Sequence, residues 1–120
     1  MVFIDGTALL KLDRGMPILS KEVSDDPKNA KGIVIGHSGQ GEAIVANRFK
    51  GVRAIVYYGG QTDILKLGRE HNDSNILSLG ARFMSPTDGL AAVNAWIATA
   101  FSGDERHKRR IAKLFNISNK

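Results

Sequence analysis

The chain has 120 residues, no cysteine and a formal net charge of +5 at pH 7. This length fits one domain with a modest core, and the lack of cysteine excludes a disulfide-stabilised fold, a thiolate nucleophile and a cysteine-ligated zinc site. No apolar run is long enough to span a membrane and no segment near the start has the pattern of a signal peptide, so we expect a cytoplasmic protein without a membrane partner.

The order of apolar segments predicts the fold. A short strand at residues 1–7 and a short helix at 17–23 are predicted before a polar turn. Alternating segments follow, in the order strand 32–36, helix 40–49, strand 53–58, helix 61–71 and strand 75–79. Buried strands that alternate with helices indicate a parallel sheet with helices on both faces, which is a three-layer Rossmann-like α/β fold.

Two helices are predicted after the last strand. Ser85 suits the N-cap of the first, with Pro86 at its first position and Asp88 in the capping-box place. Its apolar spacing predicts a buried stripe of Leu90, Val93, Ile97 and Phe101. The second helix, at about 104–115, carries most of the positive charge, since residues 103–120 hold six Lys/Arg against two acidic residues.

Residues 32–42 (GIVIGHSGQGE) form an apolar strand followed by a glycine-rich turn. Such a turn at the start of a helix can direct backbone N–H groups at an anion, and Glu42 follows it closely enough to move a proton on the same ligand. The turn lacks the lysine of a P-loop, the third glycine of a dinucleotide fingerprint and the spacing of a nucleophile elbow. A purely structural interpretation also remains, in which Glu42 only complements the helix dipole.

Five segments resemble one enzyme family in order and spacing, namely residues 43–48 (AIVANR), 51–54 (GVRA), 69–77 (REHNDSNIL), 79–82 (LGAR) and 101–110 (FSGDERHKRR). The family is that of ribose-5-phosphate isomerase B and galactose-6-phosphate isomerase. Within a single domain over residues 1–120, residues 31–115 match well and residues 1–30 match poorly.

The resemblance implies interconversion of an aldose and a ketose phosphate through an enediolate, without a metal or nucleotide cofactor. One branch of the family uses a cysteine as base, at the place where this chain has Gly36. A second branch uses a glutamate placed like Glu42. We therefore expect Glu42 as the base, with Ser38 and the segment Gly39, Gln40 and Gly41 binding the substrate and stabilising the enediolate oxygen.

The same resemblance implies that His71 helps to open the sugar ring and that Asn72 hydrogen-bonds the substrate. Arg106 and Arg110, four residues apart on one helix face, are implied to bind the phosphate in a neighbouring subunit's site, so that the protein is a homodimer or homotetramer. Without the family, an interaction with the helix dipole is the more common explanation of an isolated histidine such as His71, and a solvated basic face explains the two arginines equally well.

The family begins with a strand, turn and helix carrying an Asp-His motif, and this chain has no Asp-His pair. We therefore expect residues 1–24 to be poorly ordered or packed in an unusual way, with exposed apolar surface. We also expect the activity of the protein to be weak or absent. Two alternatives stay open. One is a degenerate or truncated sugar-phosphate-binding subunit, and the less favoured one is a nucleic-acid-binding domain, since only Phe115 interleaves the basic residues of the last helix.

Overall fold

The computed structural model describes residues 2–5, 7–10 and 16–118, with side chains from residue 19 to residue 117. Its elements, in chain order, are β1 (Val2–Asp5), β2 (Thr7–Leu10), α1 (Met16–Asp25), β3 (Ala30–Gly36), α2 (Gln40–Ala46), β4 (Ala54–Tyr57), α3 (Asp63–Glu70), β5 (Ile76–Gly80), the 3-10 turn η1 (Ala81–Phe83), α4 (Pro86–Ala98) and α5 (Glu105–Ser118). Over these described ranges, the longest helices are too short or too polar to cross a membrane.

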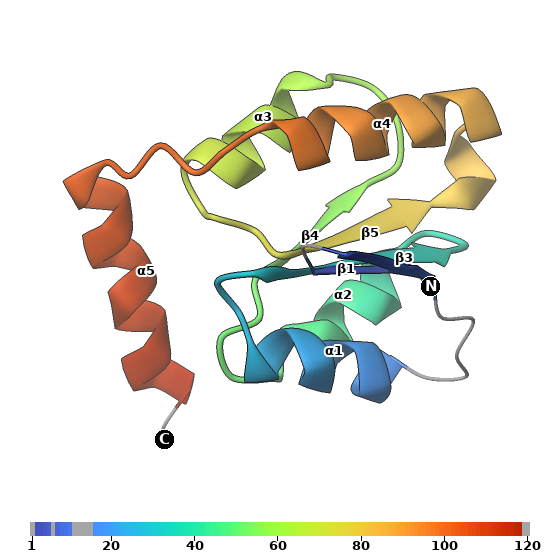
Figure 1. Cartoon of the computed structure of the whole chain (residues 1–120). Helices are drawn as coiled ribbons and strands as arrows, with labels where there is room; N and C mark the ends of the chain where they lie inside the picture. The colour runs from blue at the N-terminus through green and yellow to red at the C-terminus, as the bar shows by residue number, and fades with distance from the viewer. Residues whose placement is uncertain (1, 6, 11–15, 119–120) are drawn as a thin grey trace.

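The predicted three-layer α/β fold is confirmed. One sheet has the strand order β2-β1-β3-β5-β4, in which β3, β5 and β4 are parallel. Helices α1 and α2 cover one face, α3 and α4 cover the other, and α5 stands to the side of the sheet (Figure 1). The parallel register pairs Gly36 with Gly80, so the carboxyl ends of β3 and β5 lie side by side.

The core has two halves, one on each face of the sheet. On the α1–α2 side, the buried residues include Leu19, Val23, Val34, Ala46 and Ile76. On the α3–α4 side, they include Ile33, Leu65, Leu77, Leu79 and Trp96. Every residue of β5 is buried, as expected for a central strand of a sheet covered on both faces.

The N-terminal strands form an antiparallel hairpin. β1 pairs with β2 and also with β3, antiparallel in both cases, so it adds a reversed strand beside the parallel ones. The strand at residues 2–5 was predicted, whereas β2 and the direction of the pairing were not. The expectation for residues 1–24 also covers residues 1, 6 and 11–15, which lie outside the described residues.

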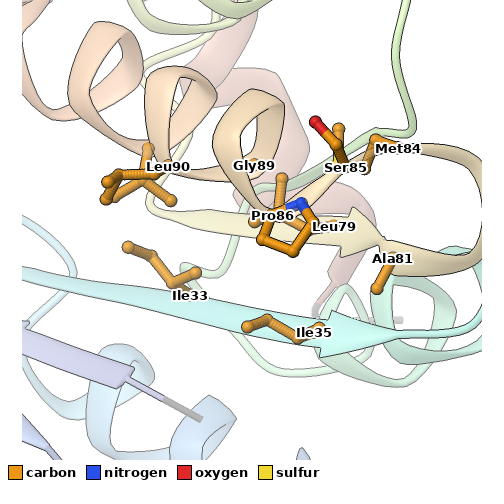
Figure 2. A pocket seen from close by; sticks show the side chains of 10 residues that line it. Ile33, Ile35, Leu79, Ala81, Met84, Ser85, Pro86, Gly89 and Leu90 are labelled. Atoms are coloured by element: carbon orange, nitrogen blue, oxygen red, sulfur yellow. The ribbon is translucent and has the colours of Figure 1, made fainter.

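An apolar groove lies on the α4 side of β3 (Figure 2). Ile33 and Ile35 of β3 form its floor beside Leu79, and Pro86 and Leu90 of α4 line its wall around a cavity of about 470 Å³. Ile35 is 60% exposed and Leu90 is 64% exposed. This face of β3 and α4 therefore presents apolar side chains to solvent.

The predicted start of α4 is confirmed, but its predicted buried face is wrong. The Ser85 hydroxyl accepts a hydrogen bond from the Asp88 N–H at 3.1 Å, which caps the helix. The residues that α4 buries are Ala92 and Trp96. Of the predicted stripe, Val93 is partly buried against the same core, whereas Leu90 and Ile97 are exposed and Phe101 lies beyond the helix end. The reason is the indole of Trp96, which is fully buried and donates to the buried Ser74 hydroxyl at 2.9 Å, so this side of the helix turns inward.

Candidate functional site

The turn after β3 is held tightly against the end of β5. Gly39 has a left-handed φ of 78°, and its carbonyl accepts a hydrogen bond from the buried Ser78 hydroxyl at 2.7 Å. A Cβ on Gly80 would lie 2.6 Å from the Ser38 carbonyl oxygen, so this close approach requires glycine. The Gln40 N–H donates to Ser38 Oγ at 3.2 Å, which leaves the Ser38 hydroxyl hydrogen able to point at a ligand.

Glu42 folds back from the first turn of α2 onto Gly36. A Cβ at position 36 would lie 2.6 Å from Glu42 Cδ and closer still to Oε1. The carboxylate therefore occupies the space that any side chain at position 36 would need. The turn thus brings a hydroxyl, backbone amides and a carboxylate to the carboxyl end of β3, and Gly41 has open space around it.

His71, Asn72 and Arg110 line one cavity of about 260 Å³, together with His107, Ile111 and Leu114. His71 ends α3, and the arginine comes from α5. The structure therefore brings together three of the residues singled out in the sequence, from segments almost forty positions apart. Imidazole, amide and guanidinium groups around one cavity can donate hydrogen bonds to an oxyanion such as a phosphate.

His107 is not among the site residues predicted from the sequence. In the structure it is buried, and its ring stacks on that of His71 with centroids 4.3 Å apart and an angle of 18° between the planes. Burial, followed by the neighbouring His71, lowers the pKa of His107. Nothing in the local sequence reports this contact, because the two histidines are 36 positions apart.

Arg106 lies one helical turn before Arg110 but points to other partners. Its Nε is 3.4 Å from the Asp104 carboxylate, and its side chain is 63% exposed. Hydrogen bonds from the Arg106 backbone and side chain hold the pKa of Asp104 below its usual value. Of the two arginines, Arg110 is the one that lines the cavity in a single chain.

The two groups of residues lie at opposite ends of the sheet. The turn bearing Glu42 follows the carboxyl end of β3, whereas His71 precedes the amino end of β5, where Gly32 pairs with Ile76. In Figure 1 the arrowheads of β3 and β5 point away from α5. The length of β5 alone separates the two ends by about 13 Å, at roughly 3.3 Å per residue. One chain therefore does not bring all the candidate residues together.

An ionic network that the sequence did not predict lies next to the His71–Asn72 turn in the chain. Asp73 lies between Arg69 and Arg53, both largely buried. The spacing of Arg69 and Asp73, four positions apart across a helix end, is the one sequence signal for it. As for metal sites, the described part of the chain holds no group of three or more potential ligands among His, Asp and Glu.

A family model described as Ribose/Galactose Isomerase matches residues 16–114. Ribose-5-phosphate isomerase B of Mycobacterium tuberculosis is 41% identical over 80 residues, which are 67% of this chain and 48% of that protein. A putative sugar phosphate isomerase of Bacillus subtilis, YwlF, is 36% identical over 108 residues, covering 90% of this chain and 69% of the relative. Several of the relatives are thus only about half covered by this chain.

Solved structures show the same fold. Type B ribose 5-phosphate isomerase from Trypanosoma cruzi superposes with a TM-score of 0.80 at 32% identity, over 87% of this chain and 66% of that one. Ribose-5-phosphate isomerase B from Mycoplasma genitalium, solved with bound ribulose-5-phosphate, gives a TM-score of 0.80 at 26% identity, over 93% of this chain and 74% of that one.

Proposed function

Because this chain belongs to the ribose/galactose isomerase family, we propose that it interconverts an aldose and a ketose phosphate through an enediolate with Glu42 as the base. The substrate class is a phosphorylated pentose, such as ribose 5-phosphate and ribulose 5-phosphate, or a hexose 6-phosphate. The observation that carries the choice of base is the position of the Glu42 carboxylate, which fills the space beside Gly36 at the end of β3.

The residues of the turn suit this chemistry. Glu42 removes the proton from C2 of the aldose, and the C2–H electron pair forms the C1–C2 double bond of the enediolate. The hydroxyl proton then passes from O2 to O1, and the same carboxyl returns the carbon-bound proton to C1 as the C2 carbonyl forms. The developing negative charge falls on the former carbonyl oxygen. The Ser38 hydroxyl and the amides of Gly39 and Gly41 would donate to that oxygen, and such a preorganised donor contributes about 3 kcal/mol to the transition state.

The second half of the proposed site opens the sugar ring and holds the phosphate. His71 transfers a proton to or from the ring oxygen, and Asn72 hydrogen-bonds a sugar hydroxyl. Arg110, with Arg106 on the same helix, binds the phosphate dianion, for which the fork of a guanidinium is well suited. Both halves consist of protein groups alone, and the reaction as proposed needs neither metal nor nucleotide.

A homodimer or homotetramer follows from the separation of the two halves. Ring opening and proton transfer act on adjacent atoms of one sugar, so Glu42 and His71 must reach the same molecule. The proposed site therefore combines the turn of one subunit with the cavity of a partner. Helix α5 supports this arrangement, since Leu114 is 48% and Ile117 is 65% exposed on it. A cytoplasmic location belongs to the same proposal, because cells retain charged sugar phosphates there.

The test compares the wild type with Glu42→Gln in isomerase assays on ribose 5-phosphate and several hexose 6-phosphates. Loss of the base predicts a fall in kcat of at least about a hundredfold with binding retained, measured by calorimetry with the same sugar phosphate. Asp25→Asn, which removes an exposed carboxylate on α1, is the matched control and should keep full activity. Equal rates for wild type and Glu42→Gln would exclude Glu42 as the base.

A sugar-phosphate-binding subunit without activity is the second candidate, favoured by the separation of the Glu42 turn from the His71 cavity within one chain. In that case the wild type and Glu42→Gln would both bind the sugar phosphate and neither would turn it over.

A further inference from the structure

The turn of residues 71–73, between α3 and β5, has an unusual backbone. Asp73 has φ = 47°, and it is the one non-glycine residue with a positive φ in the described part of the chain. Where the chain turns into the left-handed conformation after a helix, the residue in that conformation is most often glycine, because a side chain is strained there. Aspartate and asparagine are among the few other residues that adopt this conformation, and at position 73 the carboxylate also makes contacts that glycine could not make.

The Asp73 carboxylate joins two arginines from different elements. Its Oδ1 is 2.9 Å from Arg69 Nη1 and its Oδ2 is 3.5 Å from Arg53 Nη2. Arg69 belongs to α3, and its side chain is only 5% exposed. Arg53 comes just before β4, and its side chain is 13% exposed. Charges that are this well buried need partners in fixed positions.

Each arginine also binds backbone carbonyls of this region. Arg53 Nε donates to the carbonyls of Asn72 and Asp73, both at 3.0 Å. Arg69 Nε donates to the Thr99 carbonyl at 3.0 Å, and its Nη1 donates to the Ser74 carbonyl. The turn that carries His71 and Asn72 is thereby linked to α3, to the segment before β4 and to the end of α4.

The charge balance of the network depends on Asp73. Burial lowers the pKa of Arg53 and of Lys31, and Arg69 adds to this effect at both positions, whereas Asp73 opposes it. Two cationic side chains, those of Arg53 and Arg69, therefore contact one carboxylate, and the Lys31 ammonium is near enough to be affected by these charges. Without that carboxylate they would repel one another directly beneath the turn.

We propose that Arg53, Asp73 and Arg69 are positioning residues that hold the His71–Asn72 turn in the geometry in which His71 stacks on His107 and lines the cavity with Arg110. This proposal rests on the proposed isomerase function for its kinetic consequences. Its structural content, the fixed orientation of the His71 ring, is independent of the reaction.

The experiment uses Asp73→Asn and Arg53→Lys in the full chain, with Asp25→Asn as the control. Asparagine tolerates the left-handed conformation, so Asp73→Asn removes the charge while keeping the backbone allowed. Lysine keeps a positive charge at position 53 but lacks the Nε–H that reaches two carbonyls. Folding of each variant is checked by circular dichroism and thermal unfolding before the other measurements.

The first measurement is NMR of the histidine rings, of which the chain has three. In both variants we expect the His71 and His107 ring signals to shift and their mutual contacts to weaken, while His37 serves as an unchanged internal reference. A purely stabilising network would lower the melting temperature and leave the ring signals of the folded protein where they are. That result in both variants would overturn the proposal.

The second measurement separates KM from kcat with ribose 5-phosphate. Misplacing His71 and Asn72 should lower kcat/KM by between about tenfold and a hundredfold, with KM raised as well as kcat lowered. A loss of folded protein alone would lower the apparent kcat at constant KM, and that pattern would also contradict a positioning role. If the wild type itself has no isomerase activity, the proposed function fails, and the NMR result still decides this inference.

Discussion

Replacing Gly36 by alanine tests the proposed base through a residue that takes no part in the chemistry. The added Cβ would lie 2.6 Å from Glu42 Cδ and closer to Oε1, whereas ordinary contacts begin at 3.4 Å, so the carboxyl must retreat by at least about 0.8 Å. A displacement of about 1 Å at a reacting group can cost about a hundredfold in rate. Because the clash involves the far end of a flexible side chain, the free energy of unfolding should change by less than about 1 kcal/mol.

The assay measures kcat with ribose 5-phosphate and the free energy of unfolding by urea denaturation. Gly89→Ala is the matched control, since a Cβ there meets only Met84 Sδ at 3.9 Å, and it should keep the wild-type rate. In the Glu42→Gln background, Gly36→Ala should add little further loss, because its effect acts through the carboxylate. A Gly36→Ala variant with wild-type kcat, or a full additional loss in the double variant, would refute this reasoning.

Two further predictions concern the histidine pair and the core. The lowered pKa of His107 means that the folded state binds a proton at this residue less well than the unfolded state, so His107 destabilises the protein as the pH falls through the usual value of 6.5. His107→Phe should therefore reduce the change in the free energy of unfolding between pH 7.5 and pH 5, measured by urea denaturation. An unchanged pH dependence would contradict the lowered pKa of His107. Trp96→Phe removes the hydrogen bond to the buried Ser74 hydroxyl and should lower the free energy of unfolding by about 2 to 4 kcal/mol, measured by circular dichroism during denaturation. A decrease of less than about 0.5 kcal/mol would show that this hydrogen bond is dispensable.

The sequence predicted best the features that depend on neighbouring residues. The parallel strands, the helices between them and the Ser85 cap follow from apolar runs, their spacing and local hydrogen bonding, and the structure has them all. The buried face of α4 was predicted wrongly, because spacing alone does not tell Leu90 from Trp96, and the choice depends on the partner that the indole finds in Ser74.

Features that join distant parts of the chain were not predictable in the same way. The hairpin of β1 and β2 depends on which strand pairs with β3, and the stacking of His71 on His107 depends on the placement of α5. The roles of Glu42, Ser38, His71 and Arg110 remain predictions that the proposed experiments address. The contact between Glu42 and Gly36 is a six-residue fold-back, which sequence suggests only through the absence of a side chain at position 36.

The proposed sharing of one site between two subunits would have a genetic consequence. In a symmetric dimer each site would take Glu42 from one chain and His71 from the other. A dimer that pairs a chain defective in Glu42 with a chain defective in His71 would then concentrate both lesions in one site and leave the other intact. Two alleles that are each inactive alone would complement one another in the same cell, whereas two lesions within the same half would not.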